Sequence, residues 1–291
     1  MIKKILLVNL FLSILIVLVS YITTSDYNQI LSNHHLLIGF GGVLSFMTLL
    51  WLISLIVKDA SIVDIFWGPT FIVLAFTLAC SLDNYSDRTM LMILLVTLWG
   101  LRLAGHIGFR NIGHGEDLRY IVWRKEAGKH WWWFSFFRVF YMQGSLAIFV
   151  GLPLYYGQIN PASLTMTEIV ICTSIFALGL LWEAISDLQL KSFRKNSENK
   201  GKICKVGLWK YSRHPNYFGD LVSWIGLFSF TISSMNVSYI IGSSIGPLMI
   251  GLIFYKITGP MMDDMMIKSR ADYKEYMKNS NMLLPNLMKG K

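Results

Sequence analysis

Repeated apolar runs, each long enough to cross a lipid bilayer, limit this chain to a small set of folds. A transmembrane helix needs about 20 predominantly apolar residues, and only 15% of the 291 residues are charged. In soluble domains about a quarter of the residues are charged. The sequence therefore predicts an all-α, polytopic integral membrane protein with eight transmembrane helices, at 5–22, 36–57, 62–81, 89–107, 139–157, 168–190, 217–234 and 237–257.

The distribution of lysine and arginine predicts the orientation of these helices. Cytoplasmic loops of membrane proteins carry an excess of basic residues. With a cytoplasmic N-terminus, Arg88 is the only lysine or arginine that falls in an outside loop. We therefore expect both termini in the cytoplasm, with inside segments at 1–4, 58–61, 108–138, 191–216 and 258–291. The net charge of +9 then fits attraction to anionic membrane lipids, and nucleic-acid binding is not needed to explain it.

The first and second apolar runs carry few polar signatures. Lys3 and Lys4 precede the first run as they would in a signal peptide, but the run is long and no small-residue cleavage site follows, so we expect a retained anchor. Three widely spaced cysteines imply neither a disulfide framework nor a zinc site, and we predict no metal site. We divide the chain into two N-terminal helices, 1–57, and a membrane domain, 58–291, that carries the polar motifs described below.

Charged residues in the sixth run form one stripe. Glu183, Asp187, Lys191 and Arg194 lie at offsets of 0, 4, 8 and 11, which places them within about 80° of one another on a helix. An ion pair between residues four apart would account for the charges of Asp187 and Lys191. It explains Glu183 less well, because that residue lies about two turns deeper. The stripe therefore favours a surface that faces a ligand.

The stretch YSRHPNYFGD, at 211–220, opens the seventh run. Pro215 disfavours helix at His214 and suits the first turn of a new helix, whose free amides carry the positive end of the dipole. Arg213 and His214 beside these amides predict a site for phosphate or carboxylate. Asn216 and Asp220, four residues apart, can bond a ribose or an amide. The alternative is a helix start with ordinary capping.

Candidates for the substrate side lie earlier in the chain. Asp64 falls one turn inside the third run, where an ionisable residue is costly and usually functional. Glu116, Asp117 and Tyr120 lie in the loop after the fourth run, which by itself could be a solvated loop.

Four blocks carry a resemblance to a known family. DASIVDIFWG, TLWGLRLAGHIGFRNIGHGEDLRY, WEAISDLQLKSFR and GLWKYSRHPNYFGD resemble, in order, the motifs of a bacterial membrane family of unknown function. That family belongs with the steroid 5-alpha-reductase C-terminal-domain proteins, and the likeness extends over about residues 58–285. It implies a helical fold in a membrane, and we expect a bacterial inner membrane. It also implies NADPH-dependent reduction of a carbon–carbon double bond in a lipid-like substrate such as a sterol, an isoprenoid or a fatty acyl chain.

The resemblance also implies roles for particular residues. It places the cofactor region in roughly 183–291 and assigns cofactor contacts to Asp187, Arg194, Asn216 and Asp220, with weaker transfers to Lys191, Lys202, Arg213 and Tyr217. Family reductases polarise the substrate carbonyl with acidic and tyrosine side chains. For these roles we consider Asp64, Glu116, Asp117 and Tyr120, where a buried acid would stabilise an enolate and the tyrosine would donate a proton.

Two alternatives belong to other functional classes. Isoprenylcysteine-type and other small membrane methyltransferases share an RHPxYxG motif, bind S-adenosylmethionine and carry paired acids after the last span, as Asp263 and Asp264 are here. The third possibility is a lipid-binding membrane protein without enzymatic activity. The eight runs and the GHGEDLRY loop favour the reductase.

Overall fold

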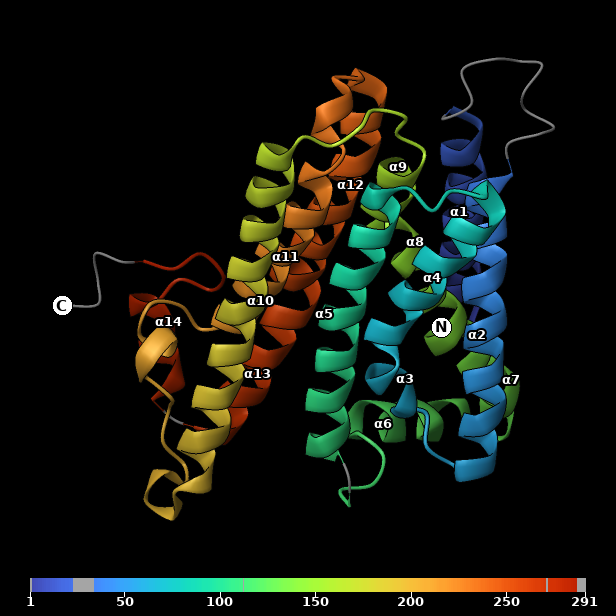
Figure 1. Ribbon diagram of the computed structural model, residues 1–291. Helices are drawn as coiled ribbons and strands as arrows, with labels where there is room; N and C mark the ends of the chain where they lie inside the picture. Colours follow the sequence, from blue (N-terminus) through green and yellow to red (C-terminus); the bar gives the residue numbers. More distant parts are fainter. Residues whose placement is uncertain (1, 23–33, 112, 271, 287–291) are drawn as a thin grey trace. The chain divides into compact units, whose positions relative to one another are not determined.

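The computed structural model describes residues 2–22, 34–111, 113–270 and 272–286, and all the secondary structure in these ranges is helical (Figure 1). Each apolar run predicted from the sequence falls mainly on helical backbone, with short breaks inside the runs 62–81, 139–157 and 217–234. The longer elements are α1 (Ile2–Ile22), α2 (His35–Val57), α4 (Trp67–Leu82), α5 (Asp87–Asn111), α10 (Met166–Lys195), α11 (Pro215–Ser229) and α12 (Val237–Ile253). The shorter ones are α3 (Ile62–Ile65), α6 (Leu118–Ala127), α7 (Trp131–Ser135), α8 (Met142–Val150), α9 (Leu152–Gln158), α13 (Gly259–Ser269) and α14 (Tyr273–Asn279).

Five helical stretches in the described ranges are long and apolar enough to cross a membrane, and they make this a multi-pass membrane protein. They are His35–Val57, Asp87–Asn111, Leu118–Val150, Met166–Lys195 and Val237–Ser269. Lys4–Val19 and Trp67–Leu82 are apolar but shorter, and α11 has only 15 residues. The count of eight spans and the side of each terminus stay predictions.

The chain divides into two compact units, residues 1–163 with 234–243, and residues 164–233 with 244–291. In the first unit, α4 and α5 cross where Gly68 and Gly100 face each other, and a side chain on either glycine would overlap the other backbone. The predicted third span is interrupted at Phe66, between α3 and α4. Pro69 accounts for the break, because proline has no N–H to donate to the carbonyl four residues earlier.

Loops that the sequence assigns to the same side of the membrane meet within the first unit. Arg88 at the start of α5 is 3% exposed and donates from Nη2 to the Ala162 carbonyl at 2.6 Å. At the other end of α5, the backbone N–H of Ala60 donates to Glu116 Oε1 at 2.8 Å. These contacts join predicted outside loops to each other and predicted inside loops to each other.

The second unit is built on an antiparallel crossing of α10 and α11 (Figure 1). Glycines permit the close approach: a side chain at Gly179 would overlap the Ser223 backbone, and one at Gly219 would overlap the Glu183 backbone. Helix α11 begins at Pro215, as the sequence predicts. The segment after α14 returns to this helix start, where His214 N donates to the Met282 carbonyl at 3.1 Å.

Candidate functional site

The first unit gathers the candidate substrate-side residues at one end of its helices. Asp64, on α3, accepts a hydrogen bond from the Tyr120 hydroxyl at 2.7 Å and another from Arg119 Nη2 at 2.7 Å. Tyr120 is 1% exposed, and the Gln143 side-chain amide on α8 donates to its oxygen at 3.4 Å. A buried phenol thus donates to a carboxylate that also pairs with a guanidinium, an arrangement able to hold and pass on a proton.

Asp117 continues this network as the N-cap of α6. It accepts from Arg119 N and from Arg119 Nε, both at 2.9 Å. Partial burial raises the pKa of Asp117, but the hydrogen bonds and the positive charge of Arg119 outweigh that effect and lower the pKa below its ordinary value. Asp117 is therefore ionised near neutral pH and helps to hold Arg119 against Asp64.

Glu116 lies next to the network but has a separate set of partners. It accepts from Arg124 Nη2 at 2.7 Å and Nε at 3.0 Å, and from the Ala60 backbone. These contacts fasten the loop that carries Asp117 to the segment before α3. Because Arg124 and the Ala60 backbone hold it in this loop, Glu116 is better suited to positioning Asp64 and Tyr120 than to reacting with a substrate.

The second unit brings part of the predicted cofactor set to the crossing of α10 and α11. Glu183 and Asp187 are 4% and 6% exposed on α10, and Asp220 is 6% exposed on α11. The contact between Gly219 and the Glu183 backbone puts Asp220 beside this part of α10. Asn216 lies one turn earlier on α11, and its Oδ1 is buried and accepts no hydrogen bond from any residue that the structure describes. Such an acceptor suits a hydroxyl or amide of a ligand.

The remaining predicted cofactor residues lie around this crossing. Lys191 and Arg194 are exposed near the end of α10, and Lys202 is exposed in the loop that follows. Tyr217, on α11, stacks on Phe254 with ring centroids 4.6 Å apart. The stripe predicted from the sequence is therefore on one helix, buried at Glu183 and exposed at Arg194.

Arg213 and His214 have protein partners on the C-terminal side of the second unit. Arg213 Nε donates to Asp263 Oδ2 at 3.1 Å, and Nη1 donates to the carbonyls of Met277 and Ser280. His214 Nε2 lies 3.1 Å from Asp263 Oδ1. The phosphate contacts predicted for Arg213 and His214 stay predictions, while the contacts in the structure hold the chain end to the start of α11.

Asp263 is a residue that sequence analysis interpreted differently. It is 3% exposed, and it also accepts from the Tyr273 hydroxyl at 2.7 Å. Its neighbour Asp264 is exposed. The two acids, a methyltransferase feature in the sequence, therefore have unlike environments here. Arg119 and Gln143 were also missed, although Arg119 stands directly before Tyr120 in the sequence and could have been considered with it.

The fold and these two polar clusters define a class: a multi-pass, all-helical membrane protein with buried ionisable groups at its helix ends. The family described as "Protein of unknown function (DUF1295)" matches residues 50–280, so the chain belongs to this steroid 5-alpha-reductase-like family. Within the described ranges, no group of three or more His, Cys, Asp or Glu side chains could hold a metal ion.

Three curated relatives are similar to parts of the chain. An uncharacterized protein of Schizosaccharomyces pombe is 27% identical over 65% of this chain and 63% of its own length. The probable O-methyltransferase ustE of Ustilaginoidea virens is 49% identical over 15% of each chain. The 3-oxo-5-alpha-steroid 4-dehydrogenase 1 of Bos taurus is 37% identical over 19% of this chain and 21% of its own. The chain thus spans less than two thirds of each relative, and no solved structure matches it.

Proposed function

We propose that this protein is an NADPH-dependent membrane reductase that saturates a carbon–carbon double bond in a lipid-like substrate, a sterol, an isoprenoid or a fatty acyl chain. The observation that carries the proposal is the hydrogen bond from buried Tyr120 to Asp64. Family membership and the partial likeness to 3-oxo-5-alpha-steroid 4-dehydrogenase 1 support the reaction class. The proposal includes eight membrane spans with both termini cytoplasmic.

In the proposed reaction, Tyr120 is the proton donor. When bound, NADPH supplies a hydride to one carbon of a double bond conjugated to a carbonyl, and negative charge then develops on the carbonyl oxygen. The Tyr120 hydroxyl turns its single proton from Asp64 to this oxygen and protonates it, which gives an enol and a phenolate. A solvent proton then adds to the other carbon, and the enol oxygen returns its proton to the phenolate. Asp64 acts as an acceptor in the structure, so it orients the phenol while Arg119 balances its charge.

The cofactor contacts are proposed for the α10–α11 crossing. The buried Asn216 Oδ1, an acceptor without a partner among the described residues, fits a ribose hydroxyl or the nicotinamide amide. Asp187 and Asp220 are proposed to bond further cofactor hydroxyls from the same crossing, beside Glu183. Lys191, Arg194 and Lys202, exposed basic residues beyond it, are proposed to meet the phosphates. We treat Arg213 and His214 as positioning residues for this helix start.

Methyl transfer from S-adenosylmethionine is the second candidate. Two observations favour it: the likeness to the probable O-methyltransferase ustE, and the concentration of buried acids at the α10–α11 crossing. Carboxylates there would suit the positively charged S-adenosylmethionine better than the negatively charged NADPH.

Cofactor-dependent thermal stability distinguishes the two reactions from a lipid-binding protein without enzymatic activity. A ligand present at 100 times its dissociation constant stabilises the folded state by about 2.7 kcal/mol. We expect NADPH to raise the unfolding temperature of purified protein in nanodiscs, and S-adenosylmethionine to have no effect. Asn216→Leu should abolish the NADPH shift, whereas Asn199→Leu, in the loop after α10, should keep it. Stabilisation by S-adenosylmethionine alone would overturn the reductase proposal, and no response to either would favour the non-enzymatic reading.

A further inference from the structure

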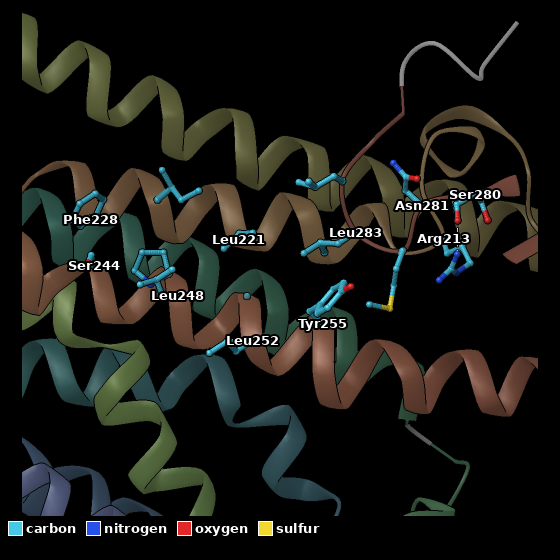
Figure 2. Close-up of a pocket in the computed structure, with 15 residues that line it drawn as sticks. Arg213, Leu221, Phe228, Ser244, Leu248, Leu252, Tyr255, Ser280, Asn281 and Leu283 are labelled. Carbon is cyan, nitrogen blue, oxygen red and sulfur yellow. Dashed lines mark hydrogen bonds between the residues drawn. The ribbon is translucent and has the colours of Figure 1, made fainter. Parts of the chain in front are cut away.

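A cavity of about 1010 Å³ lies within the second unit, between α11, α12 and the segment Ser280–Leu284 (Figure 2). One wall runs from Ser244 on α12 to Tyr255, two residues past the end of that helix, which is about 16 Å of helical backbone at 1.5 Å per residue. Ligand pockets usually have volumes of about 300–1,000 Å³. The cavity is therefore at the large end of that range, and it is elongated along the helices.

The two ends of the cavity differ in polarity. Figure 2 shows Phe228, Ser244 and Leu248 at one end, and Arg213 with Ser280 and Asn281 at the other. The walls between these ends are largely aliphatic: Leu221, Ile225, Pro247, Leu252, Leu283 and Leu284. A ligand that fits this distribution has one polar group and a long hydrocarbon chain.

The third wall is a fixed part of the protein. Backbone N–H groups of Arg213 and His214 donate to the carbonyls of Asn281 and Met282 at 2.9 and 3.1 Å, and Asn286 N donates to the Tyr211 carbonyl at 2.8 Å. A shallow groove between two membrane helices would have no such wall. Here an anchored, non-helical segment bounds one side of the groove, so a chain bound there contacts protein on this side as well as on the two helices.

This cavity is separate from the proposed cofactor contacts. On α11, its lining residues Leu221, Ile225 and Phe228 lie on average more than 100° around the helix axis from Asn216 and Asp220, at 100° per residue. The cavity and the cofactor surface therefore use different faces of the same helix.

The charge at the polar end predicts the kind of head group. The Arg213 guanidinium is 3.1 Å from Asp263, so its positive charge is already balanced. The other polar side chains at this end, Ser280 and Asn281, are uncharged. An anionic head would find no unbalanced positive charge among the lining residues, whereas the Asn281 amide can exchange hydrogen bonds with a hydroxyl or a carbonyl.

We propose that this cavity binds the single hydrocarbon chain of a long-chain lipid whose head is an uncharged alcohol or carbonyl, with the head at Asn281. This binding goes beyond the proposed function, because it requires neither NADPH nor turnover. Because the chain enters the cavity from lipid, which is as apolar as the cavity walls, its preference for the cavity comes from van der Waals contact with those walls and not from leaving water. Affinity should rise with chain length until the chain extends past Phe228.

Photolabelling in phosphatidylcholine nanodiscs tests the proposal. The probe is hexadecanol with a diazirine near the end of its chain, added without NADPH. Gly251→Leu should project into the cavity and reduce labelling roughly tenfold. Gly251→Ala is the matched control, since its methyl group would lie 3.6 Å from Leu221 Cδ1, an ordinary contact. We expect saturable labelling within 244–255 in the parent and in Gly251→Ala, with excess hexadecanol competing.

Each outcome supports or overturns the proposal. At equal mole fraction in the bilayer, octanol should compete far less well than hexadecanol, and palmitate no better than hexadecanol. If excess hexadecanol does not reduce the labelling, the probe contacts only bulk lipid and the proposal is overturned. This competition is measured on the parent protein, so it does not depend on whether Gly251→Leu folds. Much tighter binding of palmitate would contradict the uncharged head, and equal labelling of a folded Gly251→Leu protein would contradict the location.

Discussion

Each of the two units contains an aspartate that accepts hydrogen bonds from an arginine and a tyrosine, and the two clusters differ in how far solvent reaches them. In the first unit, Asp64 accepts from Arg119 and Tyr120, both at 2.7 Å. The side chains of Asp64 and Arg119 remain 18% and 29% exposed. Arg119 also pairs with Asp117. If the contact between Arg119 and Asp64 changed, Arg119 would therefore still have a negatively charged partner.

In the second unit, Asp263 accepts from Arg213 at 3.1 Å and from Tyr273 at 2.7 Å. Here the side chains of Asp263 and Arg213 are only 4% and 9% exposed, and His214 is a third partner of Asp263. Arg213 also donates to the carbonyls of Met277 and Ser280. This cluster joins the start of α11 to α13, to α14 and to the segment that follows.

The comparison teaches that residue types alone do not separate a cluster that solvent can reach from one that is enclosed in the fold. Both clusters contain an acid, a guanidinium and a phenol. The partly exposed one, around Asp64, can exchange a protein partner for a substrate. The enclosed one, around Asp263, would lose a fold contact if any partner turned to a ligand.

The largest expected effect is the loss of stability on removing the charge of Asp263. Asp263→Asn would leave the Arg213 guanidinium buried without a counter-charge, and breaking a buried pair in this way costs about 3–5 kcal/mol. Thermal unfolding in nanodiscs measures the loss. Asp264→Asn is the matched control, because this neighbour is exposed, and it should unfold like the parent. Equal stability of the two variants would show that the Asp263 cluster does not hold the fold.

A pair of tyrosine variants sharpens the contrast between reactivity and structure. Tyr120→Phe should lower turnover by about 10²–10⁴-fold, the usual contribution of a general acid, with about 1 kcal/mol of lost stability from one hydrogen bond. Tyr273→Phe should lose a similar amount of stability and keep its turnover per folded molecule. Turnover and unfolding temperature are measured on the same preparations. A Tyr120→Phe protein with full turnover would remove Tyr120 from the mechanism.

The smallest expected effect is a pH dependence at Asp117. Its folded-state pKa is lowered, so the stability it contributes is present above the unfolded pKa of about 4 and is lost as pH falls through the folded value. Because Asp117 is partly exposed, we expect only a few tenths of a kcal/mol. Asp117→Asn keeps the helix cap but not the charge. The difference in unfolding temperature from the parent should shrink as pH falls from 6 towards 3, and a difference that does not change with pH would contradict this role.

The sequence predicts local structure well because its signals are local. Apolar runs locate the helices, Pro215 locates the start of α11, and the helical period puts Glu183 and Asp187 on one face. The substrate-side candidates were chosen one by one, and the structure joins them through contacts between Asp64 and residues 55 and 56 positions away.

The sequence does not reveal contacts between residues that lie far apart along the chain. Asp263 lies 50 residues from Arg213, and no periodicity links them. The sequence therefore predicts an external anionic ligand for Arg213, whereas in the structure Arg213 pairs with the carboxylate of Asp263. Equally, the wall that Met282 and Leu283 contribute to the cavity depends on backbone hydrogen bonds between distant segments, which leave no pattern in either segment.

Transfer of deuterium from the cofactor to a lipid tests the central claim most directly. The parent protein and Tyr120→Phe, in nanodiscs, are incubated with a total membrane lipid extract and NADPH deuterated at the nicotinamide C4, in separate samples for each face of the ring. We predict a lipid that gains one deuterium from one of the two samples and one hydrogen from solvent, with at least a hundredfold less in Tyr120→Phe. If neither deuterated cofactor labels any lipid, and labelled S-adenosylmethionine transfers its methyl group to one instead, the reductase account is contradicted.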